Sequence, residues 1–206
     1  MKRFNLVVIV LSLLLVGGSE YVSSDQLSDP LDSPESIEKK RGFLFEIGGG
    51  MVGLSYGSDT DAYLAYIASY GLQRGSLMLN VNLGWYITGN AYFLLSATGI
   101  GDRLEDVYGY YMQLNTYLFA PGIKYYPFGR GLSLGSCAGL SRIVAVSNVG
   151  TSTVSSFGYG VKLFAAYDLL NKYTGFGLDI GIAANYMFIE GESVAATSLF
   201  LDLVWK

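Results

Sequence analysis

The sequence predicts an all-β fold, an eight-stranded antiparallel transmembrane β-barrel with a short helix in its first extracellular loop. In several segments apolar side chains recur at every second position, which is the period of a β-strand. Hydrophobic residues make up 51% of the 206 residues and charged residues only 15%, against roughly 25% charged in an average soluble domain. Beyond the N-terminus no stretch reaches the ~18 consecutive apolar residues of a membrane helix. A closed barrel is the other structure that satisfies every backbone group in lipid.

The N-terminus has the pattern of a secretory signal peptide over residues 1–18. Lys2 and Arg3 give it a positive start, an apolar segment follows, and Gly17 and Gly18 supply small residues for cleavage. A retained anchor helix is the alternative. Residues 19–41 are rich in Ser, Asp, Pro and Glu and lack periodicity, which predicts a disordered periplasmic lead-in. The barrel is therefore expected over residues 42–206.

Eight segments alternate between a bulky apolar face and a small or polar face. The clearest is 76–87, where Leu77 and Leu79 share one face and Asn80 and Asn82 share the other. The other seven segments are 43–55, 91–100, 109–126, 131–147, 156–170, 176–189 and 195–205. An apolar stripe backed by glycine, amide and charged side chains is typical of a wall between lipid and a narrow polar lumen.

Three segments depart from this alternation. At 52–54 a glycine bulge is expected. At 120–122 Pro121 cannot donate to a strand ladder, which predicts a second bulge. On this interpretation Thr116 and Leu118 face lipid, and a change of phase beyond Pro121 would turn Lys124 inward. Residues 61–72 have the apolar spacing of a helix, and a ninth strand would break the even count of bacterial barrels. We expect a helix there, with a strand extension as the alternative.

The lengths of the connections orient the predicted barrel. The short turns at 88–90, 127–131 and 171–175 lie at the same end as both chain termini, the periplasmic end. The connections at 58–75, 101–108, 148–155 and 190–194, mostly longer and more polar, are then extracellular. Aromatic residues gather at the periplasmic ends of the strands and predict an interfacial girdle. Its members are Trp85, Tyr125, Tyr126, Phe176 and Trp205.

The residue types argue against catalysis. There is no histidine, which removes the usual general base, the usual metal ligand and the Ser-His-Asp arrangement. No glycine-rich phosphate loop is followed by a helix and a lysine. The single cysteine, Cys137, cannot form an internal disulfide. We therefore predict no enzyme activity, no cofactor and no metal. The 17 Asp and Glu exceed the 13 Lys and Arg, which also argues against a nucleic-acid partner.

A set of charged residues falls on the predicted lumenal face. It comprises Glu46, Lys162, Asp168, Asp179 and Asp202. Eight-stranded barrels are just wide enough for side chains to fill their interior, so we interpret the set as an ion-pair network that plugs the lumen. A proton- or cation-selective constriction is the alternative. We hypothesise that Lys162 pairs with Asp168 or Asp179.

Three stretches carry a resemblance to a known group. They are the strand and turn at 85–90, the strand and turn at 124–129, and the last strand at 199–205, together with the signal peptide. With these, the chain resembles the small outer-membrane β-barrel proteins of the outer membrane protein X and outer membrane protein W type. In that group the last strand usually ends on an aromatic residue that the insertion machinery recognises. Here Trp205 is followed by Lys206, an offset of one position.

The resemblance implies a barrel in the outer membrane of a diderm bacterium, surrounded by outer-membrane lipid and inserted by the barrel-assembly machinery. It implies surface loops that serve adhesion to a host surface ligand or envelope integrity, and passage of a small hydrophobic solute. The alternative is a soluble secreted carrier barrel resembling a lipocalin. That alternative is disfavoured because a carrier for apolar ligands would turn its aliphatic face inward.

Overall fold

The computed structural model describes residues 42–88, 90–128, 131–148, 150, 152–170 and 175–205. The predicted signal peptide and lead-in, residues 1–41, lie outside the described residues, as does Lys206. Within the described part of the chain, no helix is long and apolar enough to cross a membrane.

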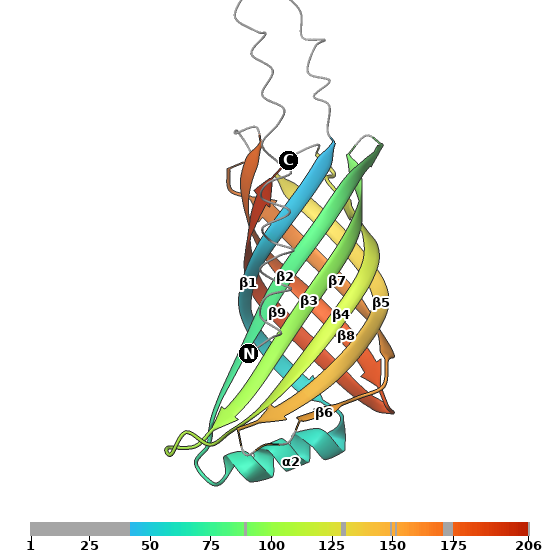
Figure 1. Cartoon of the computed structure of the whole chain (residues 1–206). Coiled ribbons are helices and arrows are strands. Elements are labelled where there is room, and N and C mark those ends of the chain that lie inside the picture. The colour runs from blue at the N-terminus through green and yellow to red at the C-terminus, as the bar shows by residue number, and fades with distance from the viewer. Residues whose placement is uncertain are drawn as a thin grey trace, which may run out of the picture. The chain divides into compact units, whose positions relative to one another are not determined.

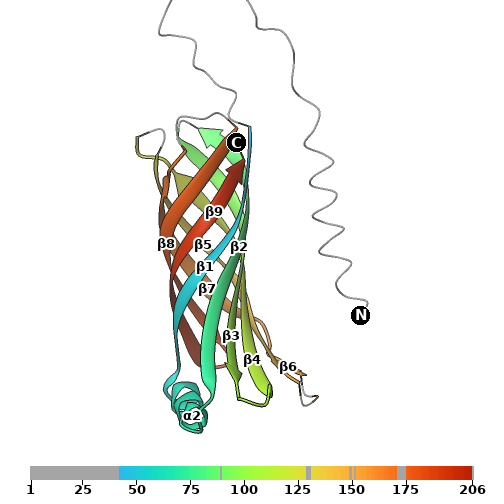
Figure 2. The same ribbon diagram turned by 90° about the vertical axis from the view of Figure 1, so that its left-hand side faces the viewer.

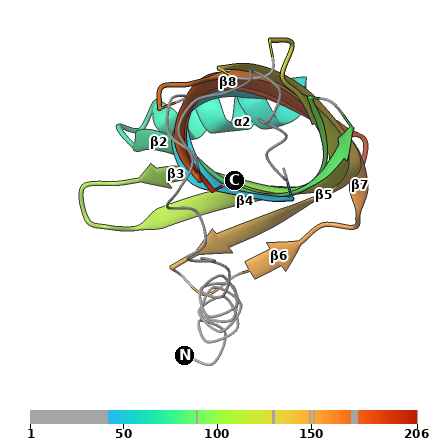
Figure 3. The same ribbon diagram turned by 90° about the horizontal axis from the view of Figure 1, so that it is seen from above.

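Eight long antiparallel strands close into a barrel (Figures 1 and 3). Each strand pairs with its neighbours in the chain, and the ring closes between the first and last strands from Phe45 opposite Trp205 to Tyr56 opposite Val194. A ninth, three-residue strand, β6 (Ser152–Val154), pairs back onto the end of β5. The long strands are β1 (Phe43–Tyr56), β2 (Gln73–Thr88), β3 (Ala91–Glu105), β4 (Tyr111–Tyr125), β5 (Leu132–Ser147), β7 (Gly158–Asp168), β8 (Phe176–Ile189) and β9 (Glu192–Trp205). The predicted eight-stranded barrel is confirmed.

The apolar face of each strand points outward. On β2, Leu77 and Leu79 are 66% and 70% exposed, whereas Asn80 and Asn82 are buried in the lumen. Leu140, Leu163, Ile182 and Leu199 repeat this outward stripe around the ring. Such a surface would be unstable in water, and it matches the lipid-facing band of a membrane barrel. The alternative of a carrier with an apolar interior is therefore wrong.

The helix α2 (Ser58–Ala68) connects β1 to β2 at one end of the barrel (Figure 2). Its first turn carries Asp59 and Asp61, which interact favourably with the helix N-terminus. Leu64 is 1% exposed and anchors the helix to the buried cluster of the barrel. After the helix, Gly71 has φ of 87°, a conformation that only glycine adopts easily. The expected helix, rather than a strand extension, is confirmed.

We call the end of the barrel that carries α2 the loop end, and the opposite end, where β9 finishes, the turn end. The loop end also holds the β3–β4, β5–β7 and β8–β9 connections. The sequence predicts that the loop end is extracellular and the turn end periplasmic.

The strand β4 corrects two predictions. Its pairing with β3 keeps one register from Tyr111 to Tyr125, so there is no bulge at Pro121. Pro121 is exposed, and its missing N–H costs the ladder one hydrogen bond without a change of phase. Thr116 and Leu118 therefore point into the lumen, 1% and 2% exposed, rather than toward lipid. Lys124 is inward because the alternation is regular, not because it flips.

One other predicted bulge and two predicted loops also differ from the structure. The register of β1 with β9 runs unbroken through 52–54, so no bulge forms there. The predicted loop at 101–108 begins as strand, because β3 continues to Glu105. The segment 148–155, predicted as a loop, contains β6. A register shift is found instead between Tyr86 and Thr88, next to the β2–β3 turn.

Glycines inside the barrel serve two purposes. A Cβ atom built on Gly135 would lie 2.1 Å from the Phe164 ring, so this glycine makes room for an inward aromatic side chain. A Cβ atom on Gly48 or Gly50 would lie 1.9 Å from a backbone carbonyl oxygen of β9. These two glycines let neighbouring strands approach closely, which a methyl group would prevent.

A tight turn joins β8 to β9 at the loop end. Glu190 and Gly191 have φ of 53° and 87°, the signs of a two-residue hairpin turn of type I′. The Glu190 carboxylate accepts a hydrogen bond from the Ser156 N–H at 2.6 Å. This contact ties the β8–β9 turn to the β5–β7 connection.

The hydrogen bond from the Ser156 N–H lowers the pKa of Glu190 below its ordinary value. A depressed folded-state pKa stabilises the fold above the ordinary carboxyl range near ~4.3, and the effect is lost as pH falls through the folded value. We expect the downfield NMR shift of the Ser156 amide proton to persist at neutral pH and to disappear at acid pH. The Glu190→Gln variant should show no such titration, and an unchanged titration in that variant would contradict the assignment.

Candidate functional site

The lumen toward the turn end is organised around Lys124 on β4. Its ammonium group lies between two carboxylates, contacting Glu46 from β1 and Asp179 from β8, the latter at 2.8 Å. Asn82 donates to the second oxygen of Glu46 at 2.7 Å. Lys124, Glu46 and Asp179 are each 1% exposed. Ions removed from water in this way need partners, because a single buried charge costs several kcal/mol.

Lys162 on β7 has different partners from those hypothesised. Its ammonium group crosses the lumen and donates to Asn80 Oδ1 at 2.6 Å and to Thr98 Oγ1 at 3.0 Å, with Ser96 Oγ at 3.4 Å. Asn80 in turn donates to Asp202 Oδ2 at 2.9 Å. The hypothesis that Lys162 pairs with Asp168 or Asp179 is wrong. A lysine side chain is long enough to reach the opposite wall, so its position on the strand does not determine its partner.

The five charged residues selected from the sequence all lie buried in the lumen. Their exposed fractions range from 1% to 2%: Glu46, Lys162, Asp168, Asp179 and Asp202. Asp168 additionally accepts hydrogen bonds from the N–H groups of Leu170 at 2.9 Å and Leu178 at 3.3 Å, which orders the start of the β7–β8 turn. The sequence did not reveal that Lys124 is the central cation or that Asn80 and Asn82 bind carboxylates. Reading the alternation as strictly regular through β4 would have indicated that Lys124 lies in the lumen.

A second buried carboxylate lies near the loop end. Asp102 on β3 is 0% exposed. It accepts two hydrogen bonds from the Arg74 guanidinium, at 3.0 Å from Nε and 2.8 Å from Nη2. The Ser76 hydroxyl donates to it at 2.8 Å and the Tyr56 hydroxyl at 3.0 Å. We call these four residues the clasp. Sequence reasoning missed it because 101–108 was predicted to be a loop and the first strand was predicted to end at residue 55, before Tyr56.

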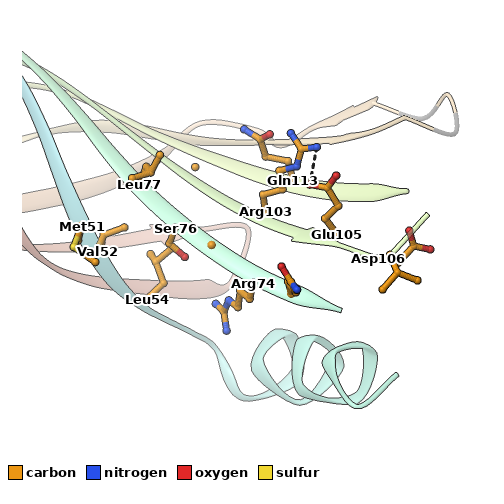
Figure 4. Close-up of a pocket in the computed structure, with 14 residues that line it drawn as sticks. Met51, Val52, Leu54, Arg74, Ser76, Leu77, Arg103, Glu105, Asp106 and Gln113 are labelled. Carbon is orange, nitrogen blue, oxygen red and sulfur yellow. Dashed lines mark ion pairs between the residues drawn. The ribbon is translucent and has the colours of Figure 1, made fainter. Parts of the chain in front are cut away.

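The clasp lies where the barrel wall opens. Among the described residues, the ladder between β1 and β2 ends at Met51 opposite Leu77. Beyond that pair β1 continues against β9 alone, and β2 continues against β3 alone. The two strands separate toward α2, as Figure 4 shows. We call this opening the wall gap. The Tyr56–Asp102 hydrogen bond connects β1 to the β2–β3 side where backbone pairing is missing, and Arg74 holds Asp102 from that same β2–β3 side.

The wall gap contains a cavity of about 1190 Å³. Its lining residues come from both faces of the wall (Figure 4). Val52, Leu54 and Ser76 belong to the inward faces of β1 and β2, whereas Met51 and Leu77 belong to the outward faces. The cavity therefore joins the outer surface of the barrel to its loop-end mouth.

Four of the five predicted girdle residues are exposed at the turn end. Trp85 is 42% exposed, Tyr125 46%, Phe176 38% and Trp205 40%. The placement of Tyr126 in the girdle is wrong. It is 3% exposed, and its ring lies inside the barrel, 5.3 Å from the Lys124 ammonium. Successive residues of a strand point to opposite faces, so Tyr125 and Tyr126 cannot both face lipid.

The arrangement holds buried charges in fixed positions inside the lumen. Within the described residues there is no group of three His, Cys, Asp or Glu side chains placed to hold a metal ion. Cys137 is a buried free thiol, 3% exposed. The buried carboxylates described above face lysine, arginine, side-chain amide, hydroxyl and backbone N–H donors that hold them in place.

A closed eight-stranded ring, an outward apolar band and a lumen filled by paired charges define a small outer-membrane β-barrel. No protein-family model matches the chain, and no curated protein matches it by sequence. Solved structures match its fold. Neisserial surface protein A has a TM-score of 0.56 at 15% identity, covering 80% of this chain and 97% of that chain.

Ail, the attachment invasion locus protein of Yersinia pestis, has a TM-score of 0.53 at 13% identity, covering 80% of this chain and 99% of that chain. A second structure of Ail, in complex with the heparin analogue sucrose octasulfate, has a TM-score of 0.52. At these identities the likeness concerns the fold. The chain thus has the fold of the small outer-membrane barrels that its sequence resembles.

Proposed function

We propose that this protein is a sealed, non-enzymatic barrel of the outer membrane that presents its loop end to an extracellular partner. The observation that carries the proposal is the filled lumen. Lys124, Lys162 and Glu46 are among its largest fully or almost fully buried side chains, and their contacts link opposite walls. A barrel of this width has little room left for a water-filled path, so the surface is the favoured site of activity.

The loop end carries a group of exposed aromatic side chains. They are Tyr63, Tyr66 and Tyr70 around α2, Tyr108 and Tyr110 in the β3–β4 connection, and Phe157 before β7, with exposed fractions from 56% to 84%. We call them the aromatic rim. Tyrosine supplies a large contact area together with a polar group, and it is enriched where proteins recognise one another.

Hydrogen bonds hold part of the rim in one conformation. The Asp106 carboxylate accepts from the N–H groups of Tyr108 at 2.8 Å and Tyr110 at 2.9 Å. Asn148 from the neighbouring connection donates to the Gly109 carbonyl oxygen at 2.8 Å and accepts from the Tyr111 N–H at 3.0 Å. A surface ordered before binding loses less conformational entropy when a partner arrives.

The charge of the loop end indicates the chemistry of the partner. Carboxylates are distributed over its connections: Asp59, Glu105, Asp106, Glu190 and Glu192. Arg103 is paired with Glu105 at 2.9 Å, and Arg142 is stacked over Phe157 at 4.8 Å. An acidic surface attracts a cationic partner and repels an anionic one. We therefore propose a basic polypeptide as the partner, not a sulfated glycan of the kind seen with Ail.

The proposal is tested with bacteria that display the barrel on their surface. We expect attachment to polylysine-coated beads and none above background to heparin-coated beads. The double variant Tyr108→Ser/Tyr110→Ser should lose most of the attachment, whereas Tyr167→Ser, an exposed tyrosine near the turn end, should not. Equal attachment of all three displayed proteins would contradict the proposal.

Passage of small hydrophobic molecules is a second candidate, and the wall gap favours it. A molecule entering the loop-end mouth could leave sideways into lipid without crossing the filled lumen. Uptake of an apolar dye into liposome membranes containing the barrel tests this candidate. If the barrel passes hydrophobic molecules, the dye is expected to enter these membranes faster than those of barrel-free liposomes. The release of trapped water-soluble solutes should not change. Insertion by the barrel-assembly machinery remains a prediction that rests on the last strand.

A further inference from the structure

The wall gap lies at the level where the outward surface changes from apolar to charged. The outward positions of β3 run from Phe93 and Leu95 through glycine to Arg103 and Glu105. A membrane strand needs roughly 9–11 residues to cross, so Arg103 lies about one span above the exposed Trp85 and Phe93 of the turn end. The cavity in the gap therefore has its lower part among lipid chains and its upper part among headgroups.

The lower part of the cavity suits an alkyl chain. Met51 and Leu77 are exposed by 75% and 66%, and they flank it as the last pair of the β1–β2 ladder. Gly75 and Gly101 also line the cavity and have no side chains to fill it. The volume of about 1190 Å³ is somewhat larger than that of ordinary ligand sites, roughly 300–1,000 Å³.

The upper part presents both signs of charge. Arg103 and Glu105 face the cavity as an exposed ion pair, each a little over 40% exposed. Asp106 adds a carboxylate, and Arg74 adds a guanidinium that Asp102 already neutralises. A head with a single charge would leave one of these signs uncompensated. A head that carries a phosphate and an ammonium group can pair with Arg103 and with the carboxylates together.

The backbone also contributes binding groups. Over the residues that form the gap, the facing edges of β1 and β2 lack the ladder that pairs them lower down. Unpaired N–H and C=O groups at an apolar boundary are costly. A polar head seated between the two edges would satisfy some of them, which is a reason for a ligand to bind in the gap rather than elsewhere on the barrel.

We propose that the wall gap binds a single-chain zwitterionic amphiphile, with its chain against Met51 and Leu77 and its head between Arg103 and Asp106. Lysophosphatidylethanolamine represents this chemistry. The site does not depend on partner binding at the aromatic rim, and it requires binding only, not passage.

Native mass spectrometry of the folded barrel, released from detergent, tests the site. We expect lysophosphatidylethanolamine to bind about tenfold more tightly than anionic lysophosphatidylglycerol or a cationic alkylamine, and free phosphoethanolamine not to bind. A tenfold ratio corresponds to ~1.4 kcal/mol, the size of one favourable ionic contact. Equal binding of the three amphiphiles, or binding of the free head alone, would overturn the proposal.

Two variants locate the ligand. Gly75→Leu fills the cavity without a clash, since a Cβ atom there has nothing within 4 Å, and it should reduce binding at least tenfold. Gly53→Leu is the matched control, because Gly53 is exposed on β1 outside the cavity lining and has only Thr197 O, at 3.9 Å, near a Cβ. Undiminished binding in Gly75→Leu overturns the proposal.

Glu105→Gln changes an exposed side chain that the fold does not need, so it keeps the test independent of folding. This variant should raise the affinity for lysophosphatidylglycerol relative to lysophosphatidylethanolamine. If the ratio of the two affinities does not change, the proposed position of the zwitterionic head beside these charged residues is wrong. If bead attachment at the rim fails while these results hold, the function proposed for the loop end is refuted and the amphiphile site is not.

Discussion

Replacing Lys124 with methionine is expected to lower the free energy of unfolding by about 3–5 kcal/mol, because it leaves buried charge without compensation. The Lys124 ammonium contacts both Glu46 and Asp179, and all three residues are 1% exposed. The loss is measured by urea titration in phospholipid vesicles, followed by the fluorescence of Trp85 and Trp205, the two tryptophans of the chain.

Lys162→Met is the matched control for this experiment. Lys162 is equally buried, but its ammonium donates to the neutral oxygens of Asn80 and Thr98. Asn80 Oδ1 keeps a donor after the change, since Thr98 Oγ1 also donates to it at 3.1 Å. We expect a loss of about 1–3 kcal/mol, the range for an unmade buried hydrogen bond. A loss from Lys162→Met as large as that from Lys124→Met would show that the Lys124 ion pairs have no special weight.

A rescue separates the effect of charge from that of packing. In the Lys124→Met background, Glu46→Gln and Asp179→Asn remove the uncompensated carboxylates and should restore part of the stability. Replacing a whole buried ionic group by neutral side chains is often close to neutral, whereas removing one partner is not. If the triple variant recovers no stability, the loss caused by Lys124→Met comes from the cavity formed around residue 124 and not from uncompensated charge.

Replacing Asp102 with alanine is expected to lower the free energy of unfolding by about 2–3 kcal/mol and to loosen the wall gap. A hydrogen bond to a buried charged group is worth roughly 1.5–3 kcal/mol. Asp102 receives hydrogen bonds from Arg74, Ser76 and Tyr56. The expected loss is kept to the size of one such hydrogen bond, although Asp102 accepts several, because the Arg74 side chain is 34% exposed and its interaction is screened by water.

The loosening is local, which gives the experiment a second readout. Amide hydrogen exchange in nanodiscs should accelerate in the last residues of β1 and the first of β2, where Asp102 joins the strands in place of a ladder. Exchange at the turn end should not change. Tyr56→Phe removes one hydrogen bond of the clasp and should cost about 1 kcal/mol. Uniform acceleration over the whole barrel would show that the clasp does not act locally.

Arg103→Gln is the control for the charge on β3. Arg103 follows Asp102 in the chain, but its ion pair with Glu105 is exposed on the outer surface, with side chains 43% and 42% exposed. Exposed pairs are worth at most about 1 kcal/mol. A loss from Arg103→Gln equal to that from Asp102→Ala would contradict the assignment of the clasp as a buried, stabilising contact.

Much of the wall could be predicted because lipid acts on every strand in the same way. A β-strand exposed to hydrocarbon must show an apolar residue at every second position, so Leu77, Leu79 and the intervening asparagines reveal their faces directly. The same reasoning gave a wrong result where the sequence allowed either of the two inward–outward alternations along a strand. Along β4, Met112 and Leu114 could belong to either face, and the prediction chose the phase that left Lys124 in need of a flip.

The partners within the lumen could not be predicted. Lys162 and Asn80 are 82 positions apart, and they meet because ring closure brings β7 opposite β2. Long side chains then choose among several acceptors within reach. The clasp has the same origin, since Tyr56, Arg74 and Asp102 come from three strands whose extension beyond the predicted bounds was not visible in the alternation.

The sequence by itself determined the solvent on each side of the wall, the number of strands and the helix after the first one, because burial and hydrogen bonding constrain each residue locally. Tertiary structure alone decided which charges pair, which of Tyr125 and Tyr126 lies inside, and that β1 and β2 separate above Met51 and Leu77. These features depend on the closure and register of the ring, and no local pattern encodes the distance between its opposite walls.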